Sequence, residues 1–216
     1  MRFRDRTDAG RQLAERLDEQ HLSDPIVLAL PRGGVPVGFE VATTLDAPLE
    51  VFVARKLGAP GQPELGIGAI SEGDGVVIDR AAAQMFGVSP ERLDALIATE
   101  RQEVERRVQR YRGLRPIPNL EHRDVAVVDD GLATGVTAEA ALRALQAHRP
   151  RRLVLAVPVC APDTVDRLRA LTDDVICVLA PNDLQAVGRW YEMFGQTSDE
   201  EVLDLLARAA QITSRR

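Results

Sequence analysis

The stretch VAVVDDGLATGVTAEAALRAL, residues 125–145, decides the fold because an apolar run, two acids, a turn and a helix-forming segment follow one another. A short run that is apolar at every position is typical of a strand covered on both faces, as in a parallel sheet. We therefore predict a strand over residues 124–129, a tight turn, and a helix over residues 136–147.

The same kind of unit recurs on both sides of this stretch. Further apolar runs predict strands at 26–30, 49–54, 153–157 and 175–179, and helical patterns fall at 5–20, 35–45 and 163–171. Strands alternating with helices at this spacing indicate right-handed crossovers. The expected fold is an α/β doubly wound domain with a mostly parallel five-stranded sheet.

Two regions depart from this alternation. Residues 55–75 are rich in glycine and proline, which predicts a loop or mobile hairpin. Ser89 and Pro90 read as a helix start, opening a long helix to about Arg112. We expect a single domain over residues 1–216, with a helical insertion at about 76–115 and an aromatic segment and helix at about 183–210. The insertion acts as a hood or lid, packs on the core, or forms the subunit contact of a homodimer.

Composition excludes several classes of function. The 27 basic and 33 acidic residues give a net charge of -6, so nucleic-acid binding is not expected. No window approaches the roughly 20 apolar residues of a membrane span, and no signal peptide is evident. Cys160 and Cys177 stand in apolar runs and are expected to be reduced, packed thiols. We therefore expect a soluble, cytoplasmic protein.

The turn after the acids has the features of a phosphate site. In a parallel α/β sheet, ligands bind outside the carboxyl ends of the strands. A turn that opens a helix there presents free N–H groups at the positive end of the helix dipole. Residues 134–137 can surround a phosphomonoester with backbone donors and two hydroxyls, while Gly131 and Gly135 permit unusual backbone conformations.

The adjacent acids Asp129 and Asp130 would be repelled by that phosphate, so we expect them to face another part of the same ligand. Vicinal ribose hydroxyls are natural partners for two carboxylates, and a hydrated Mg²⁺ is also attracted by them.

The segment DVAVVDDGLATGVT, residues 124–137, resembles the phosphoribosyl pyrophosphate signature of the type I phosphoribosyltransferases. It departs at Val136, where a smaller residue is usual. The resemblance implies that Asp129, Asp130 and Arg32 are catalytic and that Asp129 and Asp130 hold Mg²⁺ through water or the ligand. The residues implied for ligand binding are Arg32, Gly33, Gly34, Lys56, Asp129, Asp130, Gly131, Leu132, Ala133, Thr134, Gly135, Val136 and Thr137.

A second phosphate site is implied at LPRGGVPVG, residues 30–38, where Arg32 and Gly33 would form the pyrophosphate loop, often with a cis peptide. Taken alone, this segment is also compatible with a simple turn. Arg55 and Lys56 occupy the position of a pyrophosphate-binding cation, or else the start of a solvated loop. The glycine-rich stretch that follows resembles the mobile segment that closes over the reaction in this family.

The acceptor is not indicated by the sequence. Trp190 and Tyr191 either stack on a planar base or anchor the C-terminal helix to the core. The resemblance implies transfer of the phosphoribosyl group from phosphoribosyl pyrophosphate to a nitrogenous base, with release of pyrophosphate. The alternatives are a non-catalytic regulator that binds the same ligand and a hydrolase of that ligand.

Overall fold

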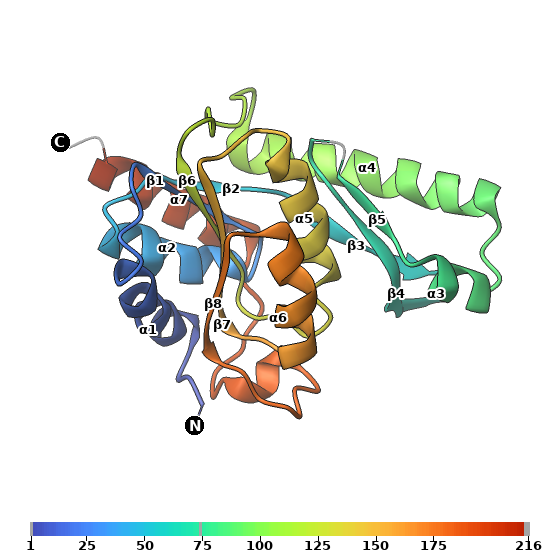
Figure 1. Ribbon diagram of the computed structural model, residues 1–216. Coiled ribbons are helices and arrows are strands. Elements are labelled where there is room, and N and C mark those ends of the chain that lie inside the picture. Colours follow the sequence, from blue (N-terminus) through green and yellow to red (C-terminus); the bar gives the residue numbers. More distant parts are fainter. Residues whose placement is uncertain (1, 74, 214–216) are drawn as a thin grey trace.

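A five-stranded, all-parallel sheet forms the centre of the protein (Figure 1). The computed structural model describes residues 2–73 and 75–213. The strand order is β2-β1-β6-β7-β8. The strands are β1 (Pro25–Ala29), β2 (Leu49–Val51), β6 (Asp124–Val128), β7 (Arg152–Val159) and β8 (Asp174–Leu179). The doubly wound α/β fold expected from the sequence is confirmed.

Helices cover both faces of this sheet because its strands are apolar on both sides. Val27 and Ala126 pack against α1 (Arg6–Asp18) and α2 (Gly34–Thr44). Their neighbours Ile26 and Val125 point the other way and pack against α5 (Val136–Gln146) and α6 (Pro162–Leu168). The alternation explains why continuous apolar runs, and not alternating ones, mark the strands.

The register of the central strands brings two distant turns together. β1 pairs with β6 from Pro25 opposite Asp124 to Ala29 opposite Val128. Both strands therefore end at the same level of the same edge. The turn after β1 and the turn after β6 lie side by side as a result.

Of the two alternatives expected for residues 55–75, a loop or a mobile hairpin, the structure shows a hairpin for most of the length. The chain forms β3 (Ala54–Ala59) and β4 (Gln62–Ser71), which make an antiparallel sheet with β5 (Val76–Ile78). A Cβ on Gly68 would come within 2.3 Å of the Val77 carbonyl oxygen, so this glycine permits close strand approach. Leu57, Ile67 and Ile70 are buried and belong to a core that the hairpin shares with β1 and α2 of the main body.

The predicted second strand, 49–54, is divided by the same feature. β2 ends at Val51, and Ala54 already belongs to β3, so the apolar run continues from the parallel sheet into the hairpin. Phe52 and Val53 are fully buried between the two sheets, which accounts for the unbroken apolar pattern.

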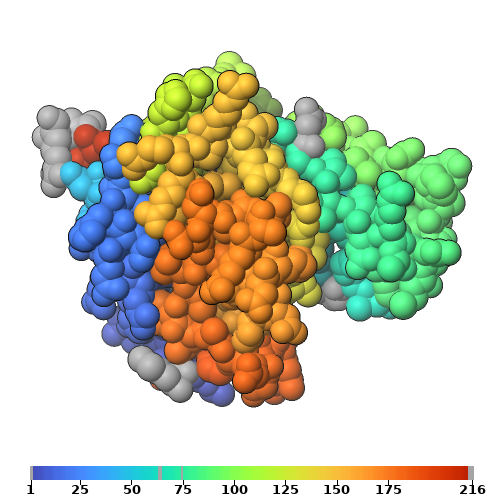
Figure 2. All heavy atoms as spheres, viewed as in Figure 1, coloured from blue at the N-terminus to red at the C-terminus, as the bar shows by residue number. Residues whose placement is uncertain are grey.

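The long helix is confirmed as α4 (Pro90–Arg112), preceded by the short α3 (Arg80–Met85). The Ser89 hydroxyl accepts from the Arg92 amide at 3.3 Å, and Gly113 ends the helix at a φ of 64°. With the hairpin, α4 forms an arm beside the main body (Figure 2). Arg112 fastens the arm by pairing with Glu72 and by donating to the Val51 carbonyl at 3.1 Å.

The C-terminal region contains the short 3₁₀ helix η2 (Val187–Trp190) and α7 (Asp199–Thr213), which packs on α2 through Val202 and Leu205. Among the described residues, no helix is long and apolar enough to cross a membrane. Cys160 is buried and Cys177 half-buried, and both are free thiols, as expected.

Candidate functional site

The two acids that follow β6 form a closely coupled pair. Asp129 accepts the amide of Asp130 at 2.8 Å through Oδ1, and Asp130 accepts Arg6 Nε at 2.8 Å through Oδ2. Burial raises the pKa of Asp129 well above its ordinary value, and the neighbouring charge of Asp130 raises it further. Burial also raises the pKa of Asp130, although Arg6 opposes this. In the described part of the chain, Arg6 is the cation paired with these acids, so two ionised carboxylates would share a single counterion.

The turn from Gly131 to α5 is fixed by β7 and α6. Leu132 donates to the Val159 carbonyl at 2.8 Å, and the Ala133 carbonyl accepts from the Thr164 hydroxyl at 2.7 Å. These contacts set the turn's path before any ligand is present.

Glycine is required at both bends of this turn. Gly131 has a φ of 154° and Gly135 a φ of 65°, and a Cβ on Gly135 would come within 2.5 Å of Thr164 Cγ2. Gly135 is the N-cap of α5 and supplies no side-chain cap. The amides of Val136 and Thr137 therefore open the helix without the usual side-chain acceptor, as a phosphate site requires.

The turn after β1 lies directly on the acids. A Cβ on Gly33 would come within 2.0 Å of Asp130 Oδ2, and one on Gly34 within 2.6 Å of the Val128 carbonyl. The cis peptide is Pro31–Arg32, one bond before the Arg32–Gly33 bond named from the sequence. Arg32 lies 3.6 Å from Asp199. The fold thus joins the two motifs that were separate in the sequence.

The basic residues of β3 have partners in the arm. Arg55 Nε lies 2.5 Å from Glu100 Oε2, so α4 engages this guanidinium. Lys56 extends along β4, since a Cβ on Gly66 would come within 3.1 Å of Lys56 Cδ. A ligand role for Lys56 stays a prediction.

The C-terminal aromatic residues serve mainly as anchors. Tyr191 is 4% exposed, donates its hydroxyl to the Asp130 carbonyl at 2.6 Å, and packs against Phe3 and Phe194. Trp190 packs on the same small core and lines a separate hollow with Arg189. This core contains Phe3 and Val159 and no residue of α7, so the two side chains anchor the chain after η2 to the N-terminal segment and β7. Base stacking and anchoring of the C-terminal helix both stay predictions.

The comparisons with known proteins agree with this geometry. The sequence profile of the phosphoribosyl transferase domain matches residues 4–189. The chain belongs to this family. The resemblance seen in residues 124–137 is thereby confirmed.

Individual relatives of this phosphoribosyl transferase domain share most of its length. Rv0571c of Mycobacterium tuberculosis, provisionally named a phosphoribosyl transferase, is 47% identical over 208 residues, covering 96% of the chain and 47% of that protein. The chain therefore spans about half the length of the curated relatives it matches. The crystal structure of TT1426 from Thermus thermophilus is 44% identical, with a TM-score of 0.80, and covers 96% of this chain and 99% of that one. AQ2163 from Aquifex aeolicus, at 12% identity and a TM-score of 0.51 over 93% of this chain and 84% of that one, shares the fold.

Two side chains of this phosphoribosyl transferase domain were missed from the sequence. Arg6 reaches Asp130 across 124 positions, and Phe194 lies beneath it, with the guanidinium carbon 3.9 Å from the ring centroid. Arg6 stands among charged residues at the start of an amphipathic helix, where a solvated face is the ordinary expectation. No local signal distinguishes it.

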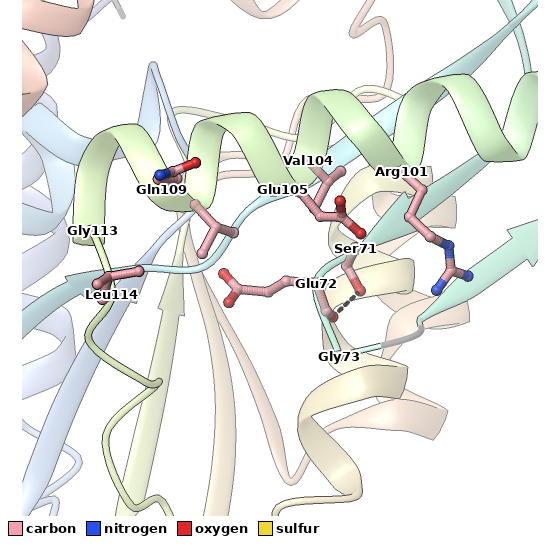
Figure 3. Close-up of a pocket in the computed structure, with 10 residues that line it drawn as sticks. Ser71, Glu72, Gly73, Arg101, Val104, Glu105, Gln109, Gly113 and Leu114 are labelled. Atoms are coloured by element: carbon pink, nitrogen blue, oxygen red, sulfur yellow. Dashed lines mark hydrogen bonds between the residues drawn. The ribbon is translucent and has the colours of Figure 1, made fainter.

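A cavity of about 420 Å³ lies elsewhere, between α4 and the end of β4 (Figure 3). It is lined by Ser71, Glu72, Gly73, Arg101, Val104, Glu105, Val108, Gln109, Gly113 and Leu114. None of the ligand-binding residues named from the sequence is among them. The site argued from the two motifs is therefore a different place in the molecule.

Proposed function

We propose that the chain transfers the 5-phosphoribosyl group from phosphoribosyl pyrophosphate to a nitrogenous base and releases pyrophosphate. The observation that carries this proposal is the meeting of an acid pair, an uncapped helix start and the Arg32 turn at one edge of the sheet. The acid pair is suited to a ribose diol, the helix start to a 5′-phosphate, and the Arg32 turn to a pyrophosphate. Phosphoribosyl pyrophosphate combines all three groups.

Each part has a distinct role in the proposed complex. Residues 134–137 hold the 5′-phosphate through backbone N–H groups, and Asp129 and Asp130 accept hydrogen bonds from the ribose hydroxyls. The turn at Arg32 receives the pyrophosphate. Positioning and charge stabilisation are sufficient for displacement at a ribose carbon that develops oxocarbenium character. The Asp130 side chain is 15% exposed, and in this proposal its carboxylate accepts the proton that the base releases.

The acid pair also fits a Mg²⁺ ion shared with the ligand. The described residues contain no group of three or more His, Cys, Asp or Glu side chains placed to hold a metal. Two carboxylates match the preference of Mg²⁺ for few protein ligands, with water and substrate phosphates supplying the others. Bound there, Mg²⁺ would neutralise charge on the leaving pyrophosphate.

The test is a screen of purine, pyrimidine and other nitrogenous bases with phosphoribosyl pyrophosphate and Mg²⁺. Pyrophosphate release and nucleotide formation are measured in parallel, with Asp129→Asn/Asp130→Asn as the inactive control. The proposal expects both products in equal amounts for at least one base. Pyrophosphate without nucleotide would indicate a hydrolase, and ligand binding without either product would indicate a regulator.

We also propose that the arm contributes the subunit contact if the protein forms a homodimer. α4 lies along one side of the arm (Figure 1), and most of its charged side chains are exposed. Light scattering of the intact chain and of a variant with reversed charges on α4 tests this.

A further inference from the structure

Both charged groups central to the proposed site already have partners from outside the two motifs. Asp130 is paired with Arg6, which begins α1, and Arg32 is paired with Asp199, which begins α7. The partner of the acid is a cation, and the partner of the cation is an acid. Arg6 therefore has the charge sign of Mg²⁺, and Asp199 has that of a phosphate oxygen.

Arg6 is held in position by three contacts. Besides Asp130, it donates Nη1 to the Gly195 carbonyl at 2.6 Å and lies over the Phe194 ring at 3.9 Å. Its side chain is 13% exposed. The guanidinium occupies Asp130 Oδ2, an oxygen that the ribose diol or Mg²⁺ would otherwise use.

Asp199 is equally well defined. Its Oδ1 accepts the Tyr111 hydroxyl at 2.6 Å and lies 3.6 Å from Arg32 Nη1. Arg107 and Arg110 also act on it, so it stands in a positive environment. A carboxylate in that environment occupies the place of a phosphate oxygen.

One short segment joins the two partners. We call residues 191–199 the C-terminal strap. The Tyr191 hydroxyl bonds to the Asp130 carbonyl, the Gly195 carbonyl accepts from Arg6, and Asp199 meets Arg32. Thr197, between the last two, is 4% exposed, whereas residues 192–196 and 198 are exposed, so the strap lies on the surface and is held there at a few points. Its residues 195–199 link the contact of Arg6 to that of Arg32 along the chain.

We propose, resting on the proposed function, that Arg6 and Asp199 are internal counterions that the two halves of the ligand replace, with the C-terminal strap coupling their release. The ribose half with Mg²⁺ displaces Arg6, and the pyrophosphate half displaces Asp199. Displacement of either counterion releases the strap. The half of the ligand that binds second therefore does not have to release the strap again. Arg6 and Asp199 thereby favour intact phosphoribosyl pyrophosphate over ribose 5-phosphate or pyrophosphate alone.

The test measures binding of pyrophosphate to the full chain by calorimetry, in Mg²⁺, with and without saturating ribose 5-phosphate. In the wild type, ribose 5-phosphate should strengthen pyrophosphate binding by about 5-fold or more, and the reverse titration should give the same factor. Arg6→Gln should tighten pyrophosphate binding in the absence of ribose 5-phosphate and bring the enhancement toward one. Simple charge attraction predicts the opposite, since removal of a cation should weaken binding of an anion.

Asp199→Asn should act reciprocally and tighten binding of ribose 5-phosphate. Phe194→Ala, which changes no charge, should shift pyrophosphate binding in the same direction as Arg6→Gln, and it serves where Arg6→Gln does not fold. Two matched controls lie on the same helices as Arg6 and Asp199. Arg11→Gln on α1 breaks a surface pair with Glu40, and Asp204→Asn on α7 breaks a surface pair with Arg208. The controls should leave both affinities and the enhancement unchanged.

The inference is overturned if Arg6→Gln or Phe194→Ala weakens or does not change pyrophosphate binding while the enhancement persists. It is also overturned if the two halves bind the wild type independently, although intact phosphoribosyl pyrophosphate binds. Failure of the wild type to bind intact phosphoribosyl pyrophosphate is a different result, because it removes the proposed function itself.

Discussion

Both edges of the central sheet carry aspartates with little exposed surface, but their charges are compensated to different degrees. At the amino edge, Asp124 begins β6 with a side chain 1% exposed, and it accepts two bonds from Arg151 at 2.8 and 2.6 Å and one from the Ser23 amide at 2.8 Å. At the carboxyl edge, Asp129 follows the same strand beside a second acid. One strand thus separates a compensated carboxylate from an under-compensated one.

The pKa directions follow from this difference. Burial opposes ionisation of Asp124 most strongly, yet Arg151 and the Ser23 amide together hold its pKa below the ordinary value. Burial raises the pKa of Asp129, and Asp130 adds to that effect. The comparison teaches that the amino edge contributes to stability, whereas the carboxyl edge retains charge for a ligand at some cost to stability.

The largest expected effect is at the carboxyl edge. Asp129→Asn combined with Asp130→Asn should preserve the fold and weaken phosphoribosyl pyrophosphate binding on the order of 100-fold or more, because two charged acceptors of hydroxyls and Mg²⁺ are lost. Calorimetric titration measures the affinity, and circular dichroism checks the fold. An unchanged affinity in a folded double variant would remove the central assignment.

Arg32→Ala should have the next largest effect. It should weaken pyrophosphate binding by about 10-fold or more and leave ribose 5-phosphate nearly unaffected, since a charged hydrogen bond is lost at only one half of the site. The two affinities are compared in the same buffer. Equal losses for both ligands would place Arg32 in folding and not in ligand binding.

At the amino edge the expected loss is in stability. Asp124→Asn should lower the free energy of unfolding by about 1–2 kcal/mol at neutral pH, because the Arg151 pair is lost. The folded pKa is lowered, so the wild-type advantage is present above the ordinary value of 3.8 and is lost as the pH falls through the folded pKa. Urea unfolding at neutral and acidic pH measures both. A loss that persists unchanged in acid would contradict the charge-based account.

A smaller effect of opposite sign should follow from Asp129→Asn alone. The folded pKa is raised, so ionisation of Asp129 costs stability as the pH rises above the ordinary value of 3.8. An asparagine cannot ionise and keeps the acceptor for the Asp130 amide. The unliganded variant should be more stable than the wild type at neutral pH, with the difference vanishing in acid. A destabilised variant at neutral pH would show that the two edges do not differ as argued.

The smallest expected effect concerns the hairpin of β3 and β4. Its strands are paired and its core residues buried, so amide exchange there should be slow and should change little when phosphoribosyl pyrophosphate and Mg²⁺ bind. Exchange in residues 191–199 should change instead. Strong protection of the hairpin on ligand binding would instead support the lid interpretation, in which residues 55–75 close over the ligand.

Features formed by one continuous segment could be predicted from the sequence, whereas features that depend on contacts between distant segments could not. The strand, acids, glycines and helix of residues 124–146 lie in one continuous segment, so its local fold and its family could be predicted from the residue types. Gly66 and Gly68 left a loop and a hairpin both open, because the sequence does not show that these glycines serve close packing against Lys56 and Val77 of neighbouring strands. Arg6 gave no signal, because its partner lies 124 positions away and only the packing of α1 against the sheet brings them together.

The central claim is that the carboxyl edge binds phosphoribosyl pyrophosphate with Mg²⁺, and a calorimetric titration of the wild-type chain tests it most directly. The protein is titrated with phosphoribosyl pyrophosphate in Mg²⁺ and again with the metal chelated. The account predicts saturable binding of one ligand per chain that weakens markedly on chelation. Absence of saturable binding in Mg²⁺, or binding of equal strength in the Asp129→Asn/Asp130→Asn variant, would contradict it.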